Sequence, residues 1–148
     1  MNETTIKELN TILKGEHMAV KSYEKFISDL KDEYVRDYFN EVSDDHKKHA
    51  QLIANRIKEL GGDPAEGTGL AGIMTDMSSA IKNLTKRSTL DILKDAYNGE
   101  DRGIGKTEEI VKGDLDEKSA VLINKILSED HDHLKKISDM ISKYEQKS

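Results

Sequence analysis

Apolar side chains recur at alternating steps of three and four residues along almost the whole of this 148-residue chain. That spacing places them on one face of an α-helix. The chain has one proline and ten glycines, and no stretch shows the apolar and polar alternation of a half-buried strand. The pattern therefore predicts an all-α protein, and the length predicts a single domain over residues 1–148 with one core.

Capping and stop signals divide this pattern into four long helices. Thr5 with Glu8, and Ser88 with Asp91, have the spacing of capping boxes. The expected helices extend from about Thr5 to Asp32, from about Glu33 to Leu60, from Ser88 to the residue before Gly113, and from about Glu117 to Tyr144. Residues 61–87 form a long connection, in which a second apolar face predicts a short amphipathic helix packed against the bundle.

Charged residues and histidines interrupt the apolar face of every long helix. The interrupting residues are Glu16 in the first helix, His46 and His49 in the second, Glu100 in the third, and Asp130 and His133 in the fourth. A shift of 84 residues aligns the two halves of this set, and it aligns Asp45 with Glu129 as well. The chain therefore looks like a duplicated helical hairpin.

The interrupting residues are expected at one depth. Glu16 and His49 are equally far from the turn between their two helices, and Glu100 and His133 are equally far from theirs. At 1.5 Å per residue this level lies about 24 Å from each turn, deep inside a bundle. Burial of several ionisable groups in one layer is unfavourable unless they bind a cation or satisfy one another. The six residues therefore predict either a metal site or a satisfied polar layer without metal.

Composition narrows the function further. The formal net charge of −6 is spread along the chain without a basic block, so nucleic acid is not expected as a partner. No signal peptide and no apolar stretch of roughly 18 residues is present, which predicts a cytoplasmic protein without a membrane span. Because the chain has no cysteine, oxygen and imidazole must supply every metal ligand.

The matched pattern resembles the ferritin-like superfamily, in particular small uncharacterised bacterial members related to rubrerythrin but without its cysteine module. Di-iron and di-manganese members take one Glu from each of two helices and a Glu-x-x-His pair from each of the other two. The resemblance implies a ferritin-like up-and-down four-helix bundle of two hairpins joined by a long crossover. It matches Glu16 and Glu100 to the single acids and His49 and His133 to the histidines, and it implies iron or manganese, with zinc as a further candidate.

Two positions depart from the family's pattern. His46 and Asp130 replace the bridging glutamates, and an imidazole with one free lone pair cannot span two metals as a carboxylate does. A single ion is therefore favoured over a pair, and His46→Glu should raise the number bound toward two. Alternatively, Asp45 and Glu129 turn inward as the missing acids, or they remain outside as partners of the ligands.

Three functions remain open from the sequence. They are oxygen or peroxide chemistry at a bound metal, metal storage or buffering, and a structural or stress-related bundle whose polar layer no longer binds metal. A monomer or homodimer is expected. His17 and His131 are expected at the surface. Tyr23 and Tyr97 are expected on core faces, either as packing residues or as groups that tune a metal.

Overall fold

The computed structural model describes residues 2–67, 87–113 and 115–147, and these contain four helices and no strand. The helices are α1 (Asn2–Asp29), α2 (Glu33–Glu59), α4 (Thr89–Val111) and α5 (Glu117–Lys147). The all-α prediction is confirmed. The short helix expected within residues 61–87 falls on residues 68–86, which lie outside the described residues.

The helix ends follow the capping signals with one exception. Ser88 and Asp91 form the predicted capping box at the start of α4, and the Asp32 side chain caps α2 by accepting a hydrogen bond from the Val35 amide at 3.1 Å. The box predicted at Thr5 is wrong, because α1 already begins at Asn2 and Thr5 lies inside it, 3% exposed. No glycine or proline stops the helix before Thr5, and Glu3 in the first turn interacts favourably with the helix dipole.

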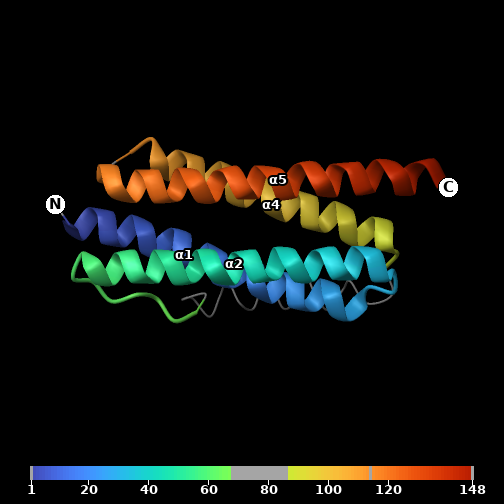
Figure 1. Cartoon of the computed structure of the whole chain (residues 1–148), viewed down its shortest axis with the longest axis horizontal. Coiled ribbons are helices and arrows are strands. Elements are labelled where there is room, and N and C mark those ends of the chain that lie inside the picture. The colour runs from blue at the N-terminus through green and yellow to red at the C-terminus, as the bar shows by residue number, and fades with distance from the viewer. Residues whose placement is uncertain (1, 68–86, 114, 148) are drawn as a thin grey trace.

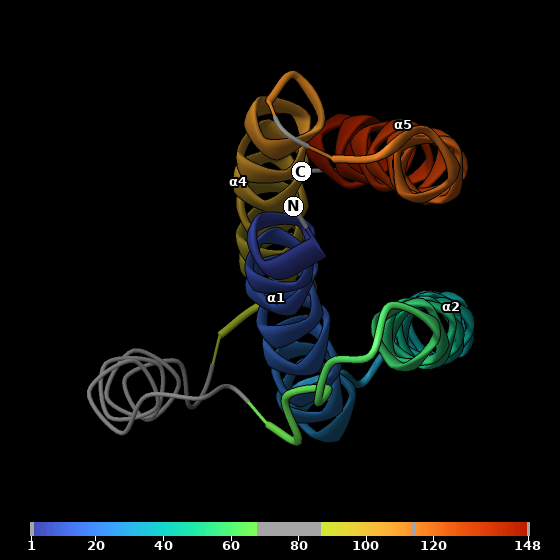
Figure 2. The same ribbon diagram turned by 90° about the vertical axis from the view of Figure 1, so that its left-hand side faces the viewer.

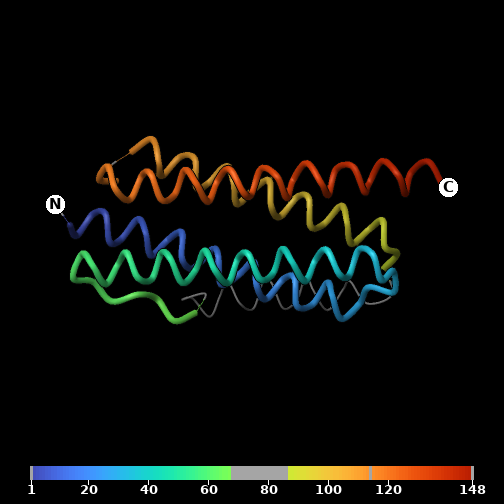
Figure 3. Tube along the Cα trace, in the orientation of Figure 1, coloured from blue at the N-terminus to red at the C-terminus, as the bar shows by residue number. Residues whose placement is uncertain are grey.

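The helices form two antiparallel hairpins, α1 with α2 and α4 with α5, whose turns lie at opposite ends of the bundle (Figure 1). Viewed along the bundle, α1 lies beside α4, and α2 and α5 occupy the other side (Figure 2). The Cα trace shows α2 and α4 running in the same direction (Figure 3). Leu60 and Ser88 therefore lie at opposite ends of the bundle, as a ferritin-like crossover requires.

The core consists of two apolar clusters separated along the bundle. One contains Tyr23, Phe39 and Leu93 among others, and the second contains Leu13 and Ile53 among others. Six buried polar side chains, contributed by all four helices, lie at one level between the two clusters. The apolar clusters provide most of the driving force for packing, since burial of apolar surface stabilises by roughly 25 cal/mol per Å².

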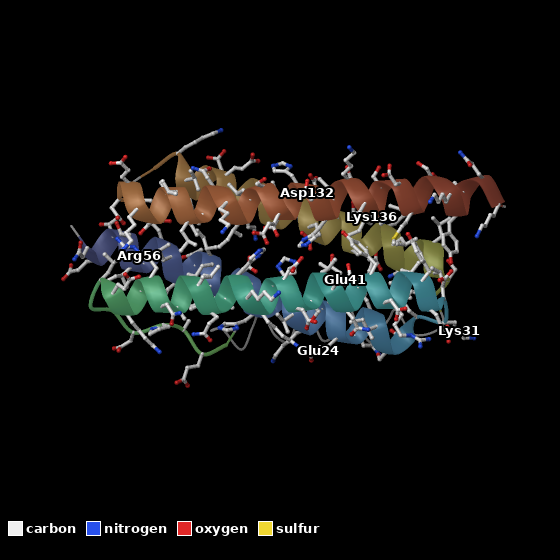
Figure 4. The ribbon with its side chains drawn as sticks, in the orientation of Figure 1. Glu24, Lys31, Glu41, Arg56, Asp132 and Lys136 are labelled. Atoms are coloured by element: carbon white, nitrogen blue, oxygen red, sulfur yellow. The ribbon has the colours of Figure 1, made fainter. Side chains whose placement is uncertain are left out.

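The α2–α5 side is closed at one end by a side-chain clamp. Arg56 near the end of α2 donates hydrogen bonds to Asp116 at 2.8 Å and to the Ser119 hydroxyl at 3.0 Å, at the start of α5 (Figure 4).

Within the described part of the chain, no helix is long and apolar enough to cross a bilayer.

Candidate metal centre

The structure brings together all six side chains that interrupt the apolar faces. Each is at most 6% exposed, and we call this set the polar layer. Its members are Glu16, His46, His49, Glu100, Asp130 and His133. They are buried because each occupies a core position on its helix, and apolar residues lie above and below them. The structure thus places every predicted site residue in the bundle interior.

His46 forms the closed side of the polar layer. Its Nδ1 lies 2.8 Å from Glu16 Oε2 and its Nε2 lies 2.6 Å from Glu100 Oε1, so one imidazole connects the acids of α1 and α4. The Tyr23 hydroxyl donates a hydrogen bond to the same Glu100 oxygen at 2.9 Å, and its ring stacks on His46 with centroids 5.7 Å apart. These contacts fix the positions of both glutamates.

The opposite side of the polar layer is open. His49 Nδ1 lies 3.4 Å from Glu16 and 3.7 Å from Asp130, and His133 Nδ1 lies 3.5 Å from Asp130 and 3.8 Å from Glu100. None of these four contacts is a hydrogen bond. His49 Nδ1, His133 Nδ1 and Asp130 Oδ1 are buried without a hydrogen-bond partner.

Acids and imidazoles therefore alternate around a closed ring of six. In this ring the two contacts of His46 are short, whereas the contacts of His49 Nδ1 and His133 Nδ1 with the acids measure 3.4–3.8 Å. Unpartnered buried polar atoms are unfavourable by about 1–3 kcal/mol each. A cation bonded to these atoms removes that penalty, so the residues present fit a metal ion.

Asp45 and Glu129 hold the outer edges of the two open-side histidines. Asp45 on α2 accepts from His133 Nε2 on α5 at 2.8 Å, and Glu129 on α5 faces His49 Nε2 on α2 at 3.1 Å. The two acids therefore lie outside the ring, and they do not occupy the bridging position. A carboxylate on the outer nitrogen turns the inner nitrogen of the imidazole toward the centre, as in many metal sites.

The electrostatics of the layer follow from this alternation. Burial alone raises the pKa of Glu100, but His133 and His46 outweigh it and hold that pKa at about 2. Burial lowers the pKa of His133, but Asp130, Glu100 and Asp45 raise it to about 10. Burial also lowers the pKa of His46, while Glu100 and Glu16 raise it well above its usual 6.5. Without a metal, imidazolium cations thus balance the acids.

Ligand atoms gather in two overlapping groups. Atoms of Glu16, His46 and His49 lie within 4.8 Å of one another, and atoms of His46, Glu100, Asp130 and His133 do the same. Both groups offer only oxygen and imidazole nitrogen, a set that suits iron, manganese or zinc. His46 belongs to both.

The remaining candidates differ from one another. His131 is exposed, as expected, whereas His17 is half-buried because its ring lies 3.0 Å from the Ala65 carbonyl oxygen. Tyr97 is half-buried against the apolar cluster that contains Phe39. The sequence did not predict that Asp45 and Glu129 pair across the bundle. Their shared four-residue spacing from His49 and His133 was the available signal.

Comparison with protein families identifies the chain. Residues 4–113 match the family described as a domain of unknown function, DUF2383. The chain belongs to this family. The match covers α1, α2 and α4, and therefore four of the six residues of the polar layer. No curated protein matches the chain.

Solved structures share the fold of this DUF2383 member. A Desulfovibrio desulfuricans bacterioferritin with a diiron site has a TM-score of 0.82 at 24% identity, covering 98% of this chain and 82% of its own. A dodecameric thioferritin, the bacterioferritin-related protein of Bacteroides fragilis, has a TM-score of 0.79 at 21% identity, covering 99% and 89%. The fold is therefore ferritin-like, as the sequence pattern predicted.

A third structure places the same fold inside a larger protein. It is a two-domain protein of Anabaena variabilis with DJ-1/ThiJ/PfpI-like and ferritin-like domains, with a TM-score of 0.81 at 14% identity. The alignment covers 100% of this chain, which spans 39% of that protein.

Proposed function

We propose that this protein binds a divalent transition metal, iron or manganese, in the polar layer and uses it in oxygen, peroxide or metal handling. One observation carries the proposal. His49 Nδ1, His133 Nδ1 and Asp130 Oδ1 are buried and lack hydrogen-bond partners, although both nitrogens lie within 3.7 Å of that oxygen. The similarly folded Desulfovibrio bacterioferritin has a diiron site, which supports metal binding by a bundle of this fold.

Carboxylates and imidazoles of the polar layer would both bind the ion. The carboxylates of Glu16, Glu100 and Asp130 supply negative charge, and His49 and His133 supply imidazole nitrogen. A bound iron or manganese ion would supply redox or Lewis-acid chemistry. The buried setting excludes bulk water from the ligands, and it strengthens every charge interaction within the layer. A cytoplasmic monomer or homodimer remains part of the proposal.

A second candidate is a structural bundle without metal. It is favoured by His46, whose short contacts with Glu16 and Glu100 are two of the six contacts around the ring. In that case the layer would act through its hydrogen bonds and ion pairs alone, and the role in stress or structure would need no cofactor.

Elemental analysis and melting separate the two candidates. The protein is purified without chelator from cells supplied with iron and manganese, and its melting temperature is measured before and after chelation. An ion present at one hundred times its Kd stabilises the fold by roughly 2.7 kcal/mol, so chelation should lower the melting temperature by several degrees.

The matched variants are Glu16→Gln and His17→Gln, which lie next to each other on α1. We expect the first to lose metal because a neutral amide replaces a charged ligand, and the second to retain it. Absence of metal together with identical melting curves in chelator, iron and manganese would support the structural bundle instead.

A further inference from the structure

His46 presents its two ring nitrogens to different halves of the bundle. Nδ1 faces Glu16 on α1 at 2.8 Å, and Nε2 faces Glu100 on α4 at 2.6 Å. The two nitrogens of an imidazole point away from each other, so both cannot bind one ion. Each nitrogen can bind a different ion, and the two ions then lie on opposite sides of the His46 imidazole.

The two ligand groups are arranged to use this property. The group of Glu16 and His49 contains His46, and so does the group of Glu100, Asp130 and His133. In each group an inward-facing histidine nitrogen has no hydrogen-bond partner, His49 Nδ1 in one and His133 Nδ1 in the other. His46 is the only member shared by both groups among the described residues.

We propose that the polar layer binds two divalent transition-metal ions, one in each group, with His46 as an imidazolate bridge between them. This inference rests on the proposed function and specifies the ligand set of the same site. It departs from the single ion that the sequence favours, because loss of the second N–H proton of His46 gives both ring nitrogens a lone pair for a metal.

The charge balance is compatible with the bridge. Two divalent ions carry four positive charges, whereas Glu16, Glu100 and Asp130 supply three negative charges. An imidazolate at His46 supplies the fourth, so the pair is neutralised within a buried layer where uncompensated charge is unfavourable. Each ion displaces one N–H proton of His46 to solvent as an N–metal bond forms, and no oxidation state changes.

The competing arrangement leaves His46 protonated between the two glutamates. A single ion would then occupy the open side of the ring, near Asp130. The two arrangements differ in the number of ions and in the role of His46. They also differ from a carboxylate-bridged pair, because ions on opposite sides of an imidazole lie farther apart than the roughly 3.5–4 Å of close two-metal sites.

Ferrous ion is the probe for the test. Chelator-treated protein is titrated anaerobically with Fe²⁺, and the bound iron per chain is counted for wild type, His46→Ala, His46→Glu and the control His17→Ala. We expect two ions in wild type and in the control, one or fewer in His46→Ala, and two in His46→Glu because a carboxylate can bridge. Circular dichroism establishes that each variant is folded.

X-ray absorption at the iron edge gives a second readout that needs only wild type and His46→Glu. We expect a short iron–iron vector in His46→Glu and none in wild type. One ion per chain in wild type would overturn the bridge and leave the proposed function intact, whereas none would remove the proposed function itself. Two ions retained in folded His46→Ala, or a short vector in wild type, would also overturn the bridge.

Discussion

Asp45 on α2 and Glu129 on α5 each contact the outer nitrogen of a histidine on the other helix. Their side chains are 36% and 44% exposed, yet each contacts the outer nitrogen of a histidine that is almost fully buried. Each contact fixes the plane of the imidazole, so that its inner nitrogen faces the ring. These acids therefore position ligands without lying among them.

Neutralising these two acids should weaken metal binding without unfolding the protein. We expect Asp45→Asn and Glu129→Gln each to lower the affinity for Fe²⁺ or Mn²⁺ about 10–100-fold, as removal of such partners does in other metal sites. Equilibrium dialysis measures the affinity. Asp44→Asn is the matched control, because that side chain lies next to Asp45 in sequence, is 68% exposed and is 3.9 Å from Lys47. Equal affinities for the Asp44 and Asp45 variants would contradict the positioning role.

At the level of helices, the sequence predicted which face of each helix is buried better than it predicted which side chains pair across the bundle. Leu9, Leu13 and Glu16 follow one another at steps of four and three along α1, and all three are buried. Ile12 and Phe26 are also buried, because a helix in a bundle covers a wider face than a single line of such steps. The cross-bundle pairs were not predictable, since they depend on how α2 and α5 are rotated and displaced relative to each other.

Gly103 inside α4 and Gly62 after the end of α2 should respond oppositely to alanine. Gly103 is an exposed position inside α4 whose added Cβ would meet nothing within 4 Å. We expect Gly103→Ala to stabilise the fold by about 0.8–1 kcal/mol through helix propensity. At Gly62, after α2, a Cβ would lie 2.7 Å from an Ile6 methyl, so Gly62→Ala should destabilise. Urea denaturation measures both, and an unchanged or lowered stability for Gly103→Ala would mean that this glycine has a role beyond the helix.

For the whole molecule, the polar layer divides one bundle into two apolar halves. The repeat of 84 residues predicted this layer, because matched positions in two hairpins related by an approximate two-fold axis must meet at one depth. His46 and Asp130 are the matched positions that differ, and they give the ring its closed and open sides. The asymmetry was visible in the sequence, whereas the gap beside Asp130 required coordinates.

The free energy of unfolding should change with pH in opposite directions for the metal-free and the metal-loaded protein. In the metal-free protein the pKa of His133 is raised from 6.5 to about 10 by Asp130, Glu100 and Asp45. Between these two values the folded state binds more protons than the unfolded state, so the free energy of unfolding falls as pH rises. The full contribution is present below pH 6.5 and is lost as pH passes about 10.

The same histidines must be neutral to bind a metal, so a bound ion is displaced as pH falls. From pH 6.5 to 8 we therefore expect the free energy of unfolding to decrease with pH in chelator and to increase with pH in saturating Mn²⁺. Urea titrations at several pH values in both conditions measure the two slopes. His133→Gln should make both slopes smaller, with the remaining slope in chelator due to His46, whose pKa is also raised. His131→Gln, at an exposed position of α5 outside the polar layer, is the control and should leave both slopes unchanged. Parallel slopes in chelator and in Mn²⁺ would show that protons and metal do not compete for these side chains.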